Sequence, residues 1–191
     1  MIPPPAGPRL EWSLDLLVDL PSSRGYVHVL TCVDVFSKYT IFIPLPDRAS
    51  RTVATAFRSH VLGVFGVPLY LRCDNGAEFK GDFSHMAAVH EIQIRRCSPY
   101  HSNANGQAER AHLTLTRLLR KALLGVPETA WSTLLPELQL AINATLSKAI
   151  NVPPYLVMFG APPTPLVRCL HSPVPPPDSS SAAVTRYTAA V

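Results

Sequence analysis

The chain has 191 residues, of which 47% are hydrophobic and 16% charged, and its formal net charge is +4. This length fits one domain with a tail and a core of its own. No apolar run reaches the length of about 18 residues that a membrane-spanning helix needs, and we expect no secretory signal. Because the four cysteines are far apart, we expect reduced thiols; the positive charge is compatible with a polyanionic partner.

Three β-strands are predicted first. Residues 10–19 alternate between apolar and other side chains, which places Asp15 mid-strand on the face opposite Trp12 and Leu14. Residues 26–34 and 39–45 are rich in β-branched and aromatic residues and complete an antiparallel meander. Ser50 is then expected to cap a helix whose apolar residues recur at helical spacing as far as Val64.

Helices alternate with two further strands in the second half. A strand at 69–73 is predicted to end in the turn Asp74-Asn75-Gly76, followed by a helix at 79–90, a strand at 92–96 and a polar loop at 98–106. Amphipathic helices are expected at 107–124 and from Pro127 onward, with a short one at 154–159. This order predicts an α/β domain with a mixed five-stranded sheet flanked by helices.

The domain is expected to span residues 10–162. Residues 1–9 are rich in Pro and Gly and are predicted to be a flexible segment. Residues 163–191 are rich in Pro, Ser and Ala, a composition typical of a disordered tail.

Three carboxylates lie where an active site is expected: Asp15 in the first strand, Asp74 at the end of the fourth, and Glu109 near the start of a helix. Three converging carboxylates repel one another unless a cation neutralises them. Hard oxygen ligands favour Mg²⁺ or Mn²⁺. Each carboxylate taken alone is also compatible with a structural role, and Asp19 and Asp34 are weaker candidates for the first ligand.

The order of several short motifs resembles the integrase catalytic core of retroviruses and of gypsy-type LTR retrotransposons. The similarity covers roughly residues 10 to 162 and is carried by Trp12-x-x-Asp15, Val33-Asp34-x-Phe36-Ser37-Lys38, Asp74-Asn75-Gly76-x-Glu78-Phe79, Ser98-Pro99-Tyr100-His101, Asn105-Gly106-Gln107-Ala108-Glu109-Arg110 and Pro154-Tyr155-x-x-x-x-Gly160. One departure is His112, at a position where the family commonly has asparagine.

The resemblance implies a ribonuclease H-like fold and an Asp15, Asp74 and Glu109 triad that is both catalytic and metal-binding, with two Mg²⁺ or Mn²⁺ ions. It implies hydrolytic trimming of a DNA 3′ end and attack of the new 3′ hydroxyl on target DNA. It also implies DNA as partner, a homodimer or higher oligomer formed through helices away from the active site, and a nuclear location.

Candidate DNA contacts flank Glu109. In the preceding loop and at the start of the helix they are Tyr100, Asn105 and Gln107, and further along the helix they are Arg110, Arg117 and Lys121. A solvated loop and a solvated helix face are the alternative interpretations of these residues.

Two classes of function stay open. The intact triad favours a polynucleotidyl transferase and endonuclease that performs DNA integration. The 191 residues include neither the His/Cys zinc domain nor the basic C-terminal domain that the resemblance implies, which favours a domesticated or truncated retroelement-derived domain that binds DNA or protein without integrating.

Overall fold

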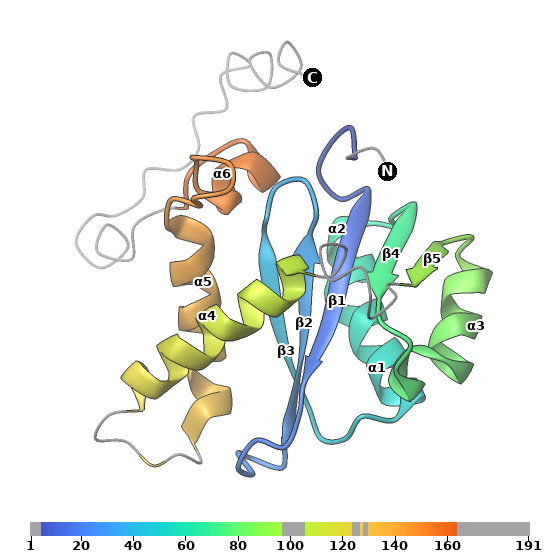
Figure 1. Cartoon of the computed structure of the whole chain (residues 1–191), viewed down its shortest axis with the longest axis horizontal. Coiled ribbons are helices and arrows are strands. Elements are labelled where there is room, and N and C mark those ends of the chain that lie inside the picture. The colour runs from blue at the N-terminus through green and yellow to red at the C-terminus, as the bar shows by residue number, and fades with distance from the viewer. Residues whose placement is uncertain (1–4, 97–105, 124–126, 128–129, 164–191) are drawn as a thin grey trace, which may run out of the picture.

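The computed structural model describes residues 5–96, 106–123, 127 and 130–163, and describes 106, 107, 109 and 122 by their backbone. Five strands form its centre (Figure 1), at β1 Glu11–Leu17, β2 His28–Asp34, β3 Thr40–Leu45, β4 Tyr70–Cys73 and β5 Gln93–Arg96. Each is shorter than the predicted segment by one to three residues, so Asp19 lies beyond β1, in a positive-φ conformation.

The strands form one mixed sheet in the order β3-β2-β1-β4-β5, which confirms the predicted architecture. β1 pairs antiparallel with β2 and β2 with β3, so the first three strands are a meander. β4 runs parallel to β1 on its other side, and β5 runs parallel to β4. β1, the strand that carries Asp15, therefore lies at the centre of the sheet.

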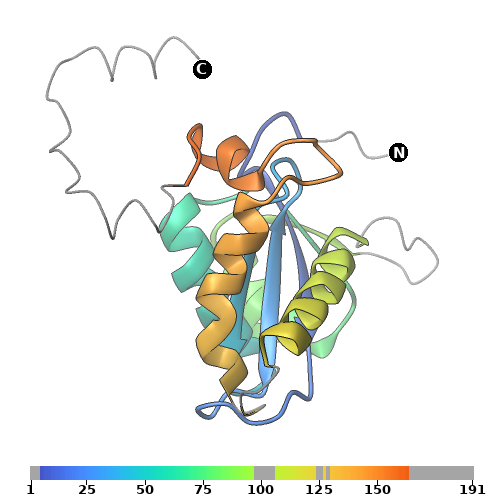
Figure 2. The same ribbon diagram turned by 90° about the vertical axis from the view of Figure 1, so that its left-hand side faces the viewer.

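Helices cover both faces of this sheet. The described helices are α1 Ser50–Phe57, the π-helical η1 Arg58–Leu62, α2 Gly63–Phe65, the 3-10 helix η2 Ala77–Phe79, α3 Gly81–Val89, α4 Gly106–Ala122, α5 Trp131–Ala144 and α6 Pro154–Phe159. Figure 2 shows α4 on one side of the sheet and α1 and α2 on the other, with α5 alongside β3. None of the helices in the described ranges has the length and hydrophobicity to cross a membrane.

Two hydrophobic clusters, one on each face, hold the layers together. Trp12 and Leu14 of β1 pack with Phe57 of α1 and Phe83 of α3 in the larger cluster. The second cluster joins the opposite sheet face to α4 and α5 through Val29, Phe42, Leu115, Leu119, Trp131 and Leu135. The alternation predicted for β1 is thus confirmed, and Asp15 belongs to the face that α4 covers.

Two local predictions were wrong, and one local feature was not foreseen. The N-cap of α1 is Ala49 and not Ser50, whose hydroxyl instead accepts a hydrogen bond from the Phe83 backbone N–H at 2.9 Å and so caps α3. The helical segment after Ser50 contains a π-helical stretch that apolar spacing does not reveal. Pro127 lies ahead of α5, which begins at Trp131.

Side-chain amides of α5 satisfy the outer edge of the sheet. Asn143, which is fully buried, accepts a hydrogen bond from the Thr40 backbone N–H at 2.8 Å and donates one to the Thr40 carbonyl at 2.7 Å. Gln139 accepts a third from the Phe42 backbone N–H at 2.9 Å. The edge strand β3 is therefore hydrogen-bonded to α5 through the side chains of the helix.

Candidate active site

The register of the sheet brings Asp15 and Asp74 together. β1 and β4 pair in parallel with Ser13 opposite Arg72, so the same register extended by two residues aligns Asp15 with Asp74. Side chains two residues apart on a strand share a face. Asp74 directly follows β4, so this register places its backbone beside that of Asp15 in the neighbouring strand; that the two carboxylates meet stays a prediction.

Asp15 is held by one hydrogen bond and one ion-pair contact. Its Oδ1 accepts from the Leu16 backbone N–H at 2.9 Å, and its Oδ2 lies 2.9 Å from Nδ1 of His112 in α4. The Asp15 side chain is 22% exposed and that of His112 is 13% exposed. An ionised carboxylate offers about four lone-pair positions, so this half-buried group keeps the capacity to bind a cation.

The backbone around Asp74 is fixed by Arg96 of β5. Arg96 donates from Nη1 to the Asp74 carbonyl at 2.9 Å, and from Nη2 to the Phe79 carbonyl at 2.6 Å and to the Ser84 hydroxyl at 3.1 Å. The exposed Asp74 side chain itself accepts a hydrogen bond from the Gly76 N–H at 2.9 Å. Arg96 thus ties the turn after β4 to β5 and α3.

The Asp74-Asn75-Gly76 turn matches the prediction, although its glycine has a different role from the usual one. Gly76 has φ −53°, a conformation open to any residue. A Cβ atom at Gly76 would lie 2.5 Å from a carboxylate oxygen of Glu78. The small residue therefore leaves room for the Glu78 side chain.

Glu109 belongs to α4, one turn before His112, and the description of this residue ends at its backbone. Among the described side chains, which exclude that of Glu109, no three His, Cys, Asp or Glu form a metal-binding group. The convergence of the full triad stays a prediction.

Asp34, the weaker candidate for a ligand, has a structural role. It is fully buried, and its carboxylate accepts hydrogen bonds from Ser37 N and Oγ, both at 2.6 Å, and from Arg9 N at 2.7 Å. Burial raises the pKa of Asp34, against these hydrogen bonds, which lower it. Asp34 therefore closes the turn between β2 and β3.

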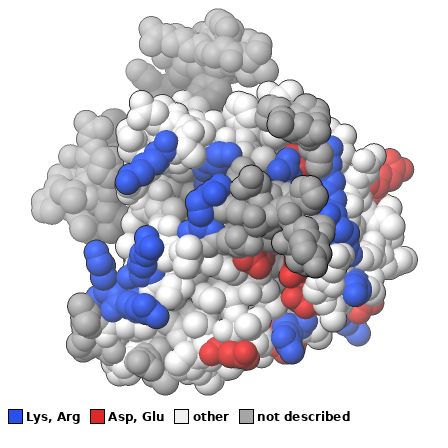
Figure 3. Space-filling model, in the orientation of Figure 1, with Lys and Arg blue, Asp and Glu red and all other residues white. Residues whose placement is uncertain are grey.

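The predicted DNA contacts are only partly described. Arg110, Arg117 and Lys121 are exposed on α4, and the last two line a shallow pocket with Arg120. Figure 3 shows basic side chains gathered on the face that carries α4, some of them directly beside acidic ones. Gln107 is described by its backbone alone, and Tyr100 and Asn105 lie outside the described residues.

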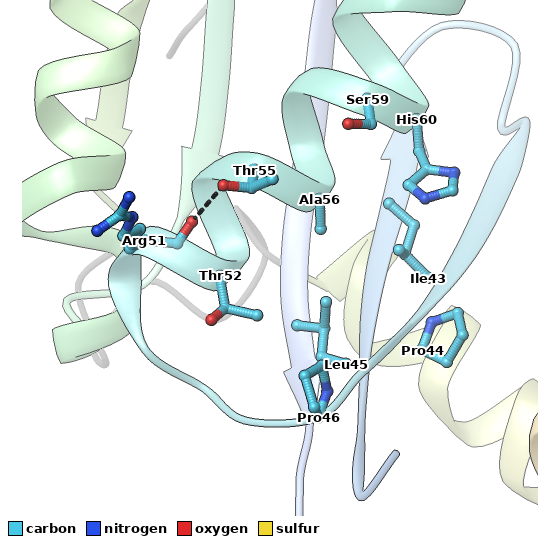
Figure 4. A pocket seen from close by; sticks show the side chains of 10 residues that line it. All are labelled: Ile43, Pro44, Leu45, Pro46, Arg51, Thr52, Thr55, Ala56, Ser59 and His60. Atoms are coloured by element: carbon cyan, nitrogen blue, oxygen red, sulfur yellow. Dashed lines mark hydrogen bonds between the residues drawn. The ribbon is translucent and has the colours of Figure 1, made fainter. Parts of the chain in front are cut away.

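Another pocket lies on the opposite face of the sheet, between β3 and the segment formed by α1 and η1 (Figure 4). Its lining residues are Ile43, Pro44, Leu45, Pro46, Arg51, Thr52, Thr55, Ala56, Ser59 and His60. None of these is a carboxylate, so this pocket has none of the hard, charged oxygen ligands of a magnesium site.

Three functional features escaped the analysis of the sequence: the contact of His112 with Asp15, the Arg96 hydrogen bonds, and an ion pair of Glu11 with Arg72 and Arg95. The only sign of the His112 contact in the sequence is that histidine replaces the asparagine common at this position in the family that the sequence resembles. The partners of Glu11 lie on other strands, and those of Arg96 lie in the turn after β4, in η2 and in α3, at separations that sequence spacing does not reveal.

Comparisons with known proteins agree with this geometry. The family model described as "Integrase core domain" matches residues 5–102. Over 157 residues the chain is 34% identical to the Pro-Pol polyprotein of Simian foamy virus type 3 (strain LK3), covering 82% of this chain and 14% of the polyprotein. It is 29% identical over 162 residues to the Transposon Tf2-3 polyprotein of Schizosaccharomyces pombe (strain 972 / ATCC 24843), covering 82% of this chain and 12% of the polyprotein.

The fold is also similar to that of a solved structure of the HTLV-2 integrase catalytic core domain in complex with magnesium, in its trimeric form. That similarity has a TM-score of 0.65 at 19% identity and covers 80% of this chain and 98% of the other. The chain spans only about one seventh of the foamy virus polyprotein. By the family model and the order of its elements, this chain belongs to the integrase core domain family.

Proposed function

We propose that this chain performs the metal-dependent chemistry of an integrase core, namely trimming of DNA 3′ ends and their transfer to target DNA. The observation that supports the proposal is the parallel pairing of β1, which carries Asp15, with β4, which Asp74 follows, together with the contact of Asp15 with α4, the helix that contains Glu109. A nuclear location and self-association belong to the same proposal.

The donor set fits two Mg²⁺ or Mn²⁺ ions. Asp15, Asp74 and Glu109 would hold them, because carboxylate oxygens are the ligands that these hard cations prefer. When bound, such ions stabilise the attacking and leaving oxygens of an in-line phosphoryl displacement. The magnesium in the HTLV-2 integrase core, a protein of the same fold, supports this choice of metal.

The residues of the chain orient the reaction in this proposal. His112 and the Leu16 N–H hold the Asp15 carboxylate, and Arg96 holds the backbone of Asp74. The basic side chains of α4 bind DNA phosphates through charge. Positioning of this kind accounts for a large part of the catalysis of phosphoryl transfer.

Rejoining of a branched DNA substrate tests the proposal, because it makes small demands on recognition of the DNA ends. The wild-type chain should show weak Mn²⁺-dependent joining that is lost in Asp15→Ala, Asp74→Ala and Glu109→Ala. Asp19→Ala, which removes an exposed carboxylate beyond β1, should keep the wild-type level. If wild type and Glu109→Ala are equally inert, a binding module without integration is the better interpretation.

A thermal measurement gives a readout that does not depend on activity. Binding of a divalent ion to the folded state raises its stability, so millimolar Mn²⁺ should raise the melting temperature of wild type. Asp15→Asn and Asp74→Asn should remove this response. Equal shifts in all three proteins would show that these carboxylates do not form the site.

A further inference from the structure

A buried glutamate lies on the same sheet face as Asp15, four residues earlier in β1. Glu11 is 1% exposed, and its two carboxylate oxygens accept hydrogen bonds from Arg72 of β4, from Nε at 2.6 Å and from Nη2 at 3.0 Å. Arg95 of β5 donates to the same carboxylate from Nη1 at 2.8 Å. Three neighbouring strands thus contribute to one ion network.

One arginine already neutralises Glu11, so the second adds a positive charge. The two-pronged contact of Arg72 is the arrangement in which a guanidinium matches a carboxylate best. Arg95 is held by its own hydrogen bond and by stacking over the Tyr70 ring, with its Cζ 3.4 Å from the ring centre. The side chains of Arg72 and Arg95 are 14% and 24% exposed, so part of each guanidinium reaches the surface.

A further cation, Lys38, adjoins this network. Lys38 lies in the turn after β2, which is tied to β1 by a hydrogen bond from the Val35 N–H to the Glu11 carbonyl at 2.8 Å. Lys38 adopts a positive φ of 64° and donates from Nζ to the Val35 carbonyl at 2.6 Å. Burial lowers the pKa of Lys38, Asp34 raises it, and the charges of Arg110 and Arg72 lower it again. Through these two hydrogen bonds, Lys38 lies beside the backbone of Glu11.

We propose that the basic cluster formed by Arg72 and Arg95 on the Glu11 carboxylate and by the neighbouring Lys38 binds a backbone phosphate of the DNA strand that enters the active site. The inference rests on the proposed function and adds a subsite to it. Arginine pairs with stacked, fixed guanidinium groups are well suited to phosphate oxygens.

The position along the strand suits a phosphate close to the reacting one. Arg72 precedes Asp74 by two residues, which corresponds to roughly 7 Å of extended chain. A DNA strand rises by about 3.4 Å for each nucleotide. A phosphate bound by Arg72 would therefore lie within a few nucleotides of one held near Asp74.

The test is binding of a fluorescein-labelled DNA duplex, measured by anisotropy at several salt concentrations in EDTA, so that the metal site is excluded. Arg95→Gln and Lys38→Gln should each weaken binding several-fold and reduce the slope of log K against log salt by about one. Glu11→Gln removes the neutralising charge and should tighten binding. Arg51→Gln, an exposed cation of α1 on the opposite face, is the matched control.

Opposite effects of Glu11→Gln and Arg95→Gln would establish the subsite, because a purely structural ion network predicts loss of stability from both with no change in salt dependence. If Glu11→Gln does not fold, the salt dependence of DNA binding by Arg95→Gln and Lys38→Gln tests the inference. Salt slopes of Arg95→Gln and Lys38→Gln equal to that of Arg51→Gln would overturn the inference. If the wild-type chain does not join DNA but still binds DNA through the basic cluster, the result contradicts the proposed function and leaves the inference standing.

Discussion

Asp34 shows how a single buried carboxylate becomes part of the framework of this site. Its three hydrogen-bond donors come from a turn and from the segment before β1. That turn also carries Lys38 and is hydrogen-bonded to β1. The geometry of Asp34 therefore sets the position of one cation of the basic cluster.

The pH dependence of stability should reveal the burial of Asp34. Because burial raises its pKa above the ordinary 3.8, the folded chain holds this proton more tightly than the unfolded chain. The contribution of Asp34 to the free energy of unfolding is therefore full below pH 3.8 and falls as pH rises through the raised pKa. Asp34→Asn does not ionise and should lack this component.

Urea denaturation of both proteins, from about pH 3 to pH 6, measures the effect. The unfolding free energy of wild type minus that of Asp34→Asn should decrease as pH rises. A difference that increases with pH would mean that the hydrogen bonds to the ionised carboxylate outweigh its burial.

Arg96 is the second residue with a testable role. Arg96→Met removes donors to the Asp74 carbonyl, the Phe79 carbonyl and the Ser84 hydroxyl. We expect a loss of at least about 2 kcal/mol, since hydrogen bonds from charged groups contribute about 1.5–3 kcal/mol each. The Mn²⁺ concentration for half-maximal thermal stabilisation should rise as well.

Arg96→Lys, which keeps the charge and a donor, should restore part of the Mn²⁺ response, while exposed Arg58→Met serves as the control. Unchanged Mn²⁺ response in a destabilised Arg96→Met protein would limit Arg96 to a role in folding.

The positions of Asp15 in a strand and of Asp74 in a turn could be predicted from the sequence, but the arginine contacts around them could not. Strand alternation places Asp15 opposite the apolar face of β1, and an Asp-Asn-Gly turn marks the end of β4. Arg72, Arg95 and Arg96 contact residues 12 to 84 positions away in sequence. Such contacts depend on the strand order, which hydrophobic spacing does not specify.

Helix starts illustrate the same limit at the scale of elements. Serine is a residue type that often caps the N-terminus of a helix, and Ser50 lies at the start of α1. Its hydroxyl, however, accepts a hydrogen bond from the Phe83 backbone N–H in α3 and donates one to the Lys80 carbonyl. Local propensity identified the residue as a cap but not the helix that it caps. The π-helical η1 is likewise a feature that the spacing of apolar residues does not predict.

Removing the Ser50 cap should weaken α3. Ser50→Ala leaves the Phe83 N–H without its side-chain acceptor, so we expect a loss of about 1 kcal/mol of stability. Urea denaturation measures this, with exposed Ser59→Ala as the control. An unchanged midpoint in Ser50→Ala would show that the hydroxyl contributes nothing to α3.

The order of strands and helices predicted the layers of the whole molecule. It did not predict an apolar groove on its surface. The groove lies at the β3 side between α2, α5 and α6 and includes Tyr39, Val64, Phe65, Leu135 and Phe159. Trp131 is not available for association, since it is 1% exposed and donates to the Pro21 carbonyl at 2.6 Å. Val64 and Phe159 are 66% and 40% exposed and extend the groove to the surface.

Self-association through this groove is the prediction at this scale. Sedimentation of wild type at about tens of micromolar should show a dimer, and Val64→Glu should shift it toward monomer because the charge would be buried without a partner. Val89→Glu on α3, where the native valine is 64% exposed, is the matched control. Equal sedimentation of the two variants would place the contact elsewhere.

The amides of α5 on β3 have a consequence for the fate of the protein at high concentration. An exposed edge strand presents a row of unpaired N–H and C=O groups that template the addition of strands from other molecules. Asn143 and Gln139 occupy such groups on Thr40 and Phe42, in the first half of the largely apolar strand Thr40–Leu45. A helix that unfolds locally would expose this segment before the rest of the sheet, so the docking of α5 protects the chain against growth into fibrils.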